Sequence, residues 1–112
     1  MCIFCDIAEG KIPSKKVYED DLVLAFDDIN PIAPVHTLII PKKHFDDVID
    51  LSINDDGTYL KACMETIGKV ASAKNIESGF RVINNCREDG GQTVMHVHFH
   101  VIGGVKLTEK ML

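Results

Sequence analysis

Short stretches rich in apolar, β-branched and aromatic residues recur along the chain between polar or proline positions, a pattern that is typical of β-strands. Two such stretches flank the polar pair Asp20-Asp21 and predict a β-hairpin. Asn30-Pro31 and Pro34 interrupt the pattern and predict a loop before the next strand. In all, strands are expected over residues 17–19, 22–26, 37–40, 80–84 and 94–102.

A helical spacing of apolar residues is clearest over residues 55–74. The apolar stripe recurs every three or four residues and consists of Leu60, Cys63, Met64, Ile67, Val70 and Ala71. Shorter helical stretches are expected over residues 3–9 and from His44 to Leu51. Strands in near succession with one long helix predict an α+β fold, with a mainly antiparallel five-stranded sheet, one long helix and short helices.

The composition predicts a globular protein with a single domain over residues 1–112. Apolar residues make up 46% of the chain and charged residues 26%, and no repeat or linker divides it. The net charge of −5 argues against a nucleic acid polymer as the main ligand, because basic residues hold phosphate backbones. With no apolar run as long as a membrane span and no secretory signal, we expect a cytoplasmic protein. Its small core favours a homodimer.

Histidine is concentrated in the last predicted strand. His96, His98 and His100 alternate with apolar residues, so the three imidazoles are expected on one face of the strand. The same pattern would arise if the strand merely exposed polar residues to water, or if the three rings bound a catalytic metal. Because imidazole changes charge near neutral pH, a cluster of this kind favours chemistry over a plain surface.

The strand and the glycines that follow it resemble the signature of the histidine triad (HIT) nucleotide-binding proteins, and the Gly-Gly ending is similar to the phosphoramidase branch. That signature is His96-Val97-His98-Phe99-His100-Val101-Ile102-Gly103-Gly104. The resemblance extends over most of the chain. It includes Cys2-Ile3-Phe4-Cys5, Ala25-Phe26-Asp27-Asp28-Ile29-Asn30-Pro31, Ala33-Pro34-Val35-His36, Ile40-Pro41-Lys42-Lys43-His44, Arg81-Val82-Ile83-Asn84-Asn85-Cys86 and Gly90-Gly91-Gln92-Thr93.

The resemblance implies a hydrolase that acts on purine nucleoside phosphoramidates and binds AMP or GMP. It assigns His98 as the nucleophile that attacks the α-phosphorus and forms a nucleotidyl-histidine, a covalent intermediate that divides one difficult step into two. His36 and His100 would complete the catalytic cluster and assist proton transfer. The residues implied in nucleotide binding are Asp28 at the ribose, Ile29 beside the base, and Asn85, Gln92, Thr93, His98 and His100 at the phosphate or leaving group.

Cys2 and Cys5 have the spacing of half a tetrahedral zinc site, and the chain has no second Cys-x-x-Cys to complete it. Two buried thiols without a metal are the alternative. The resemblance to the zinc-containing branch implies His44 and His96 as the other ligands. Four protein ligands leave no position for water, so this zinc is expected to be structural, with no metal needed for the chemistry.

Two other functions fit the same residues. One is hydrolysis of dinucleoside polyphosphates, although Gly103-Gly104 is a poor match to that branch; the other is a nucleotide-binding regulator with incidental turnover. Thr93 stands where better-known phosphoramidases have Ser, and its extra methyl group is expected to affect access of the leaving group. The tail 105–112 matches no specificity-bearing C-terminus.

Overall fold

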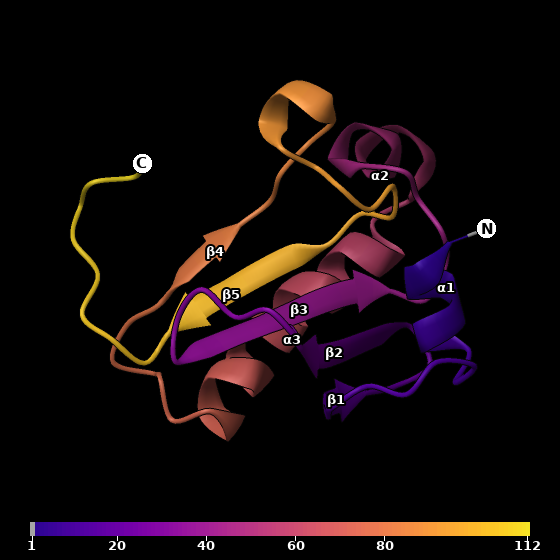
Figure 1. Ribbon diagram of the computed structural model, residues 1–112. Helices are drawn as coiled ribbons and strands as arrows, with labels where there is room; N and C mark the ends of the chain where they lie inside the picture. Colours follow the sequence, from indigo (N-terminus) through magenta and orange to yellow (C-terminus); the bar gives the residue numbers. More distant parts are fainter. Residues whose placement is uncertain (1) are drawn as a thin grey trace.

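The computed structural model describes residues 2–112 and has the expected α+β architecture. Five antiparallel strands form one sheet in the order β1-β2-β3-β5-β4 (Figure 1). The elements are α1 (Ile3–Ala8), β1 (Lys16–Glu19), β2 (Val23–Asp27), β3 (Val35–Pro41), α2 (Val48–Asn54), α3 (Thr58–Ala73), β4 (Arg81–Ile83), a 3-10 turn (Glu88–Gly90) and β5 (Phe99–Gly103). Within residues 2–112, no helix is long and apolar enough to cross a membrane.

The two faces of the sheet pack against different helices. Alternate residues of β2 show the division: Val23 and Ala25 face the long helix α3, whereas Leu24 and Phe26 face α1. In Figure 1, α3 lies behind the sheet. The α3 face is closed by Val97, Phe99 and Val101, which leaves the intervening histidines on the opposite face, as expected from the alternation.

The two larger helices begin later than expected. Helix α2 starts at Val48 rather than His44, because the carboxylate of Asp47 accepts a hydrogen bond from the Asp50 N–H (2.8 Å) and caps the helix there. Asp55 then ends α2, and α3 begins only at Thr58. The segment that carries His44 is consequently a loop and not a helix.

The buried stripe of α3 is rotated relative to the expected one. Leu60 and Met64 are 39% and 40% exposed, whereas Thr66 is buried with Cys63 and Val70. The Thr66 hydroxyl donates to the Ala62 carbonyl (2.7 Å), so its burial leaves no polar group unsatisfied. Apolar spacing alone did not distinguish these two overlapping stripes.

The last strand is shorter than expected, and this difference positions the histidines. Strand β5 begins at Phe99, and residues 94–98 form a bent segment that leads into it. Its neighbour β4 ends at Ile83, which is paired with His100, so the ladder on that side stops there. His96 and His98 therefore lie just outside the ladder, where their backbone groups are available for other contacts.

Candidate functional site

His36 of β3, His100 of β5 and His98 of the segment just before β5 meet on the face opposite α3. His36 is paired with Ile102 and His100 with Leu38, so the two histidines are diagonal neighbours across β3 and β5. Their ring centroids lie 5.1 Å apart, and the centroids of His98 and His100 lie 5.0 Å apart. The fold therefore brings the three residues of the expected catalytic cluster into contact.

The ring of His98 is held in one tautomer. Its Nδ1–H donates to the backbone carbonyl of His96 (2.8 Å), which leaves the lone pair of the neutral ring on Nε2. Burial lowers the pKa of His98, so the ring is uncharged at neutral pH. A neutral imidazole with a free Nε2 lone pair is a competent nucleophile.

Two residues that had no role in the sequence analysis hold His98 in place. Phe4 of α1 packs edge-on against the ring at 5.0 Å, and the side-chain amide of Asn84 donates to the His98 carbonyl (2.9 Å). Phe4 was detectable as an apolar position of the N-terminal helix, but its contact depends on tertiary packing. Asn84 replaces a ladder hydrogen bond just beyond the end of β4.

The protons of His36 and His100 are placed by a chain of hydrogen bonds. The Ile32 N–H donates to Nδ1 of His36 (3.1 Å), so the His36 proton is on Nε2, which lies 2.8 Å from Nδ1 of His100. His100 accepts there and must carry its own proton on Nε2. That nitrogen is buried and has no partner within residues 2–112.

Burial also keeps His100 uncharged. Loss of hydration lowers its pKa from 6.5 to about 4, and the neighbouring rings of His98 and His36 act in the same direction. An unsatisfied buried N–H costs free energy unless a ligand accepts from it. The site thus offers a free lone pair on His98 and a free donor on His100.

The expected ribose-side residues border a cavity of about 700 Å³, lined in part by Asp28, Ile29 and His36. Ile29 is 92% exposed at the rim. An Asp28 carboxylate oxygen lies 3.4 Å from Nε2 of His36, which links the cavity to the histidines. Asp28 and the histidine cluster are therefore parts of one site.

The three residues expected at the phosphate differ in exposure and in hydrogen-bond partners. Thr93 is exposed and Asn85 is half-buried beside Gly91, but the amide of Gln92 is fully used by the protein. That amide donates to the carbonyls of Asp46 (2.7 Å) and Val94 (3.0 Å) and accepts from the Arg87 N–H (2.7 Å). Gln92 thus anchors its loop, and no hydrogen bond within residues 2–112 joins Asn85, Gln92 or Thr93 to the histidines.

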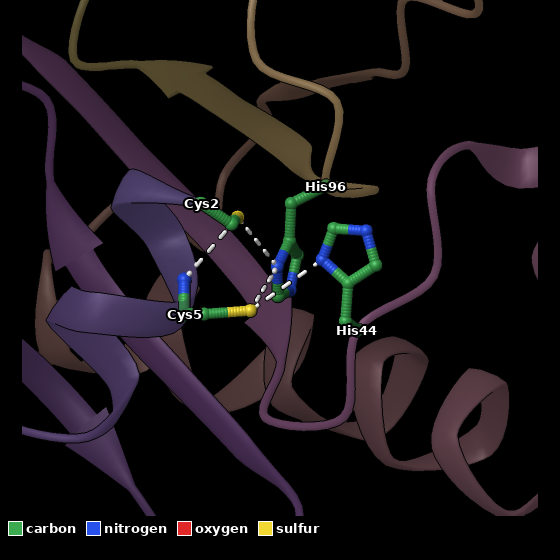
Figure 2. Close-up of side chains that lie close together, drawn as sticks. All are labelled: Cys2, Cys5, His44 and His96. Atoms are coloured by element: carbon green, nitrogen blue, oxygen red, sulfur yellow. Dashed lines mark hydrogen bonds between the residues drawn. The ribbon is translucent and has the colours of Figure 1, made fainter.

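A second cluster contains the expected metal ligands Cys2, Cys5, His44 and His96, brought together from α1, the loop before α2 and the segment before β5 (Figure 2). Nδ1 of His96 lies 3.4 Å from Sγ of Cys2 and 3.5 Å from Sγ of Cys5, and Nδ1 of His44 lies 3.4 Å from Sγ of Cys5. A tetrahedral zinc with ordinary bond lengths separates its sulfur and nitrogen ligands by about 3.5 Å. The donor set therefore fits zinc in both chemistry and size.

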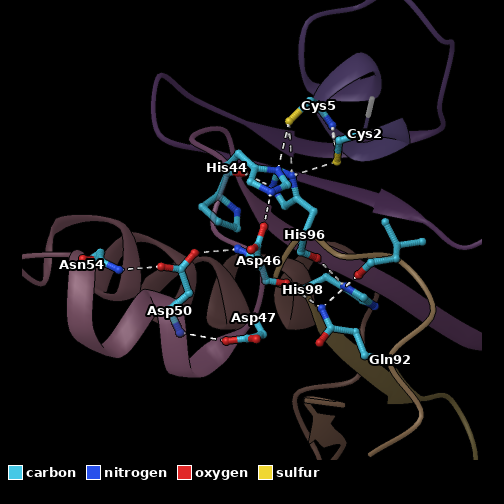
Figure 3. A network of polar contacts seen from close by, with 12 residues as sticks. Cys2, Cys5, His44, Asp46, Asp47, Asp50, Asn54, Gln92, His96 and His98 are labelled. Atoms are coloured by element: carbon cyan, nitrogen blue, oxygen red, sulfur yellow. Dashed lines mark hydrogen bonds and ion pairs between the residues drawn. The ribbon is translucent and has the colours of Figure 1, made fainter. Parts of the chain in front are cut away.

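Outer hydrogen bonds orient both candidate ligand rings. Nε2 of His96 donates to the Pro41 carbonyl (2.8 Å) and Nε2 of His44 to the Asp46 carboxylate (2.7 Å), so both Nδ1 lone pairs face the sulfur atoms. Figure 3 follows this network from Asp46 to Asp50 of α2. Burial and the neighbouring Cys2 raise the pKa of Cys5 to about 11, so its thiolate requires a nearby cation.

His96 belongs to both clusters. Its ring faces Cys2 and Cys5, while its carbonyl accepts the hydrogen bond from Nδ1–H that sets the tautomer of His98. Displacement of His96 would therefore disturb the candidate nucleophile as well as the candidate metal site.

Comparison with known proteins identifies the family of this site. A profile of the family described as HIT domain matches residues 9–107. Protein HitA of Neisseria gonorrhoeae is 41% identical over 102 residues, covering 91% of this chain and 94% of that protein. The structure of a histidine triad protein from Clostridium difficile is 51% identical, with a TM-score of 0.91 and coverage of 98% of this chain and 96% of that one. A HIT family hydrolase from Legionella pneumophila is 45% identical, with a TM-score of 0.88 and coverage of 97% of each chain. With the histidine cluster, these matches show that the chain belongs to the HIT domain family.

Proposed function

We propose that the protein hydrolyses purine nucleoside phosphoramidates and releases a nucleoside monophosphate. The observation that carries the proposal is the pairing of the free Nε2 lone pair of His98 with the unpartnered Nε2–H of His100. A nucleophile and a hydrogen-bond donor on adjacent rings suit displacement at phosphorus, where the leaving group gains electron density as the nucleophile attacks.

In the first step, Nε2 of His98 forms a bond to the α-phosphorus while the bond from phosphorus to the leaving nitrogen breaks. The amine departs with one proton taken up from solvent, and the His100 donor stabilises the leaving nitrogen through a hydrogen bond. His98 becomes positively charged, and its Nδ1–H bond to the His96 carbonyl strengthens in consequence.

In the second step, water attacks the phosphorus and the bond to His98 breaks. The attacking water returns one proton to solvent, so His98 recovers its neutral form and the nucleoside monophosphate leaves. No net proton remains on the protein. The oxygens of the α-phosphate are placed by the loop of Asn85, Gly91 and Thr93, in which Gln92 acts as the anchor.

The two glycines at the end of β5, Gly103 and Gly104, stand where a side chain would have little room. A Cβ at Gly103 would lie 3.0 Å from the Ile76 side chain, and one at Gly104 would lie 3.0 Å from Pro34. Gly104 also has a φ of +81°, which side-chain-bearing residues rarely adopt. Glycine at position 104 lets the loop that leads from Asp28 to β3 lie close to the end of β5, whereas glycine at position 103 leaves room for Ile76 and Phe80.

Zinc is the proposed metal at Cys2, Cys5, His44 and His96. When bound, it would supply a structural cross-link between α1 and the segment that precedes β5. Because its thiolate ligands must remain reduced, we place the protein in the cytoplasm. We also infer a homodimer, since β4 is an edge strand and its Val82 side chain is 38% exposed.

The proposal is tested by the release of amine from a fluorogenic AMP phosphoramidate. The wild type is expected to turn over the substrate, and His98→Ala is expected to lose at least about 10³-fold in kcat while retaining affinity for AMP. A histidine such as His44 is unsuitable as a control because it lies in the candidate metal site. The control variant is therefore Ile53→Ala, at an exposed side chain of α2, which is expected to keep the wild-type activity. AMP binding without turnover in the wild type would favour a regulatory module, and turnover of only dinucleoside polyphosphates would favour the other hydrolase branch.

A further inference from the structure

Asp28 is held between the nucleotide cavity and the histidines. Its Oδ1 accepts from the Asn30 N–H (2.8 Å), and its backbone N–H donates to the His36 carbonyl (3.0 Å). These contacts fix the second carboxylate oxygen 3.4 Å from Nε2 of His36. The side chain is 20% exposed and lines the cavity, so a ligand in the cavity can reach the same carboxylate.

The charge of the Asp28 carboxylate acts on the single proton of His36. His36 has one proton, on Nε2, because the Ile32 N–H needs the lone pair of Nδ1. His36 shares that proton in a hydrogen bond with Nδ1 of His100 (2.8 Å), while the carboxylate oxygen Oδ2 of Asp28 lies 3.4 Å from the same nitrogen and attracts the proton electrostatically. The side chain of His36 is only 4% exposed, so water is not a ready alternative acceptor. A ligand that offsets the negative charge of Asp28 therefore strengthens the hydrogen bond from His36 to His100.

We propose that the sugar hydroxyls of the bound nucleotide, by donating hydrogen bonds to Asp28, weaken the attraction of its carboxylate for the His36 N–H, strengthen the hydrogen bond from His36 to His100 and so make His100 a stronger donor to the leaving group. The inference rests on the proposed function and deepens it. Asp28 is then a positioning residue that couples occupation of the nucleoside site to the chemistry. The preferred substrates are accordingly ribonucleotides with free 2′ and 3′ hydroxyls.

The physical basis is the polarisation of linked hydrogen bonds. A carboxylate that accepts hydrogen bonds from hydroxyls attracts the His36 N–H proton less strongly. A stronger hydrogen bond at Nδ1 of His100 withdraws electron density from that ring, which strengthens donation from its Nε2–H. This donor meets the leaving nitrogen as negative charge develops there, so the effect belongs to the transition state and to kcat.

The first experiment compares an AMP phosphoramidate with its 2′,3′-dideoxy analogue in the wild-type protein. We expect kcat for the dideoxy substrate to be about tenfold lower, because one lost or weakened hydrogen bond in the transition state is worth about that factor. A rise in KM with kcat unchanged would show that the hydroxyls serve affinity alone, and the inference would be wrong.

Two neighbouring aspartates allow a matched comparison. Asp28→Asn is expected to reduce the kcat ratio between the two substrates to within about twofold, because an amide carries no charge for the hydroxyls to modulate. Asp27→Asn should keep the full ratio, since Asp27 contacts Thr37 (2.9 Å) and Lys74 (2.8 Å) instead of the histidines. A ratio that survives Asp28→Asn, or that is lost equally in both variants, would contradict the coupling.

A second readout does not depend on turnover. Heteronuclear NMR of the imidazole nitrogens reports the hydrogen bonding of His36 and His100 directly. AMP is expected to shift the Nδ1 resonance of His100 more than 2′,3′-dideoxy-AMP does at saturation of each. Equal shifts would overturn the inference even for an active enzyme, whereas unequal shifts in a protein without turnover would support the coupling and contradict only the proposed hydrolysis.

Discussion

At the scale of single residues, the histidines of the candidate active site differ in the hydrogen bonds that place their protons. His98 donates from Nδ1 to the His96 carbonyl, whereas His100 accepts at Nδ1 from His36 and keeps its proton on Nε2. The same residue type thus offers a free lone pair at one position and a free N–H donor at the next alternate position. Burial maintains both rings in the neutral form on which these roles depend.

Because His100 is kept neutral by burial, we expect its contribution to the free energy of unfolding to fall at acidic pH. Its pKa is about 4 in the folded protein and near 6.5 in the unfolded chain, so between these values the unfolded chain binds a proton that the folded protein does not. The contribution of His100 to the free energy of unfolding is therefore fully present above pH 6.5 and decreases as the pH falls toward 4. In His100→Gln, the free energy of unfolding is expected to decrease over this pH range by on the order of 1 kcal/mol less than in the wild type, because solvent screens the partly exposed ring.

Urea unfolding of the two proteins at several pH values in this range checks the prediction. Only the slopes are compared, since the substitution also changes the stability at neutral pH. His96 and His98 are present in both proteins, so their titration cancels in the comparison. Parallel pH profiles would show that His100 is not kept neutral by the folded state.

At the scale of elements, α1 is a short helix whose attachment depends on few contacts. Phe4 and Ile7 are its only buried side chains, and they pack on the sheet beside Leu24, Phe26 and Leu38. A helix of six residues has little stability of its own. The proposed zinc would fasten it to His96 and His44 through Cys2 and Cys5, which serve as the N-cap and a first-turn residue of the helix.

Removal of zinc is therefore expected to loosen α1 and to lower the thermal stability. The purified wild type should contain about one zinc per chain, and a chelator should lower Tm by several degrees, because each 1 kcal/mol is worth about 4 to 8 °C in a domain near this size. Metal analysis and thermal unfolding measure the two effects. Cys5→Ser should lose the metal, whereas Cys86→Ser, a cysteine outside the cluster, should retain it. A wild-type protein that is free of zinc after purification from zinc-containing medium would contradict the assignment.

At the scale of the whole molecule, the sheet has an unpaired edge. Strand β4 is paired only with β5, and the exposed Val82 lies at its centre. A domain of this size buries only about two-thirds of the surface of its unfolded chain, so a second copy is a natural way to cover apolar surface. Edge strands of this kind pair readily with another chain unless charge prevents it.

Sedimentation equilibrium is expected to give twice the 12.4 kDa mass of the chain. Val82→Lys should shift the protein toward the monomer, because a lysine at the centre of an edge strand opposes pairing. Ile53→Lys places the same change on α2, at a side chain that is 73% exposed, and should leave the mass unchanged. A wild-type protein that sediments as a monomer at all concentrations would exclude the dimer.

The sequence alone predicted the main elements and the residue types that gather in the two clusters. The alternation of His96, His98 and His100 with apolar residues assigned them to one face, and the spacing of Cys2 and Cys5 indicated half of a metal site. Both depend on periodicity or spacing within a few residues, which is why they were predictable. The length of β5 was not, because a strand ends where its partner ends, and β4 stops at Ile83.

Only the tertiary structure decided how the pieces act on one another. The approach of His36 to His100 joins residues that are 64 positions apart, and the approach of Cys2 to His96 joins residues that are 94 positions apart. Such contacts follow from the register of β3 against β5 and from the docking of α1, neither of which is encoded in local spacing. The placement of each imidazole proton depends on these distant partners. The sequence could therefore indicate which residues are candidates for the chemistry, whereas the tertiary structure determined which nitrogen of each ring is free.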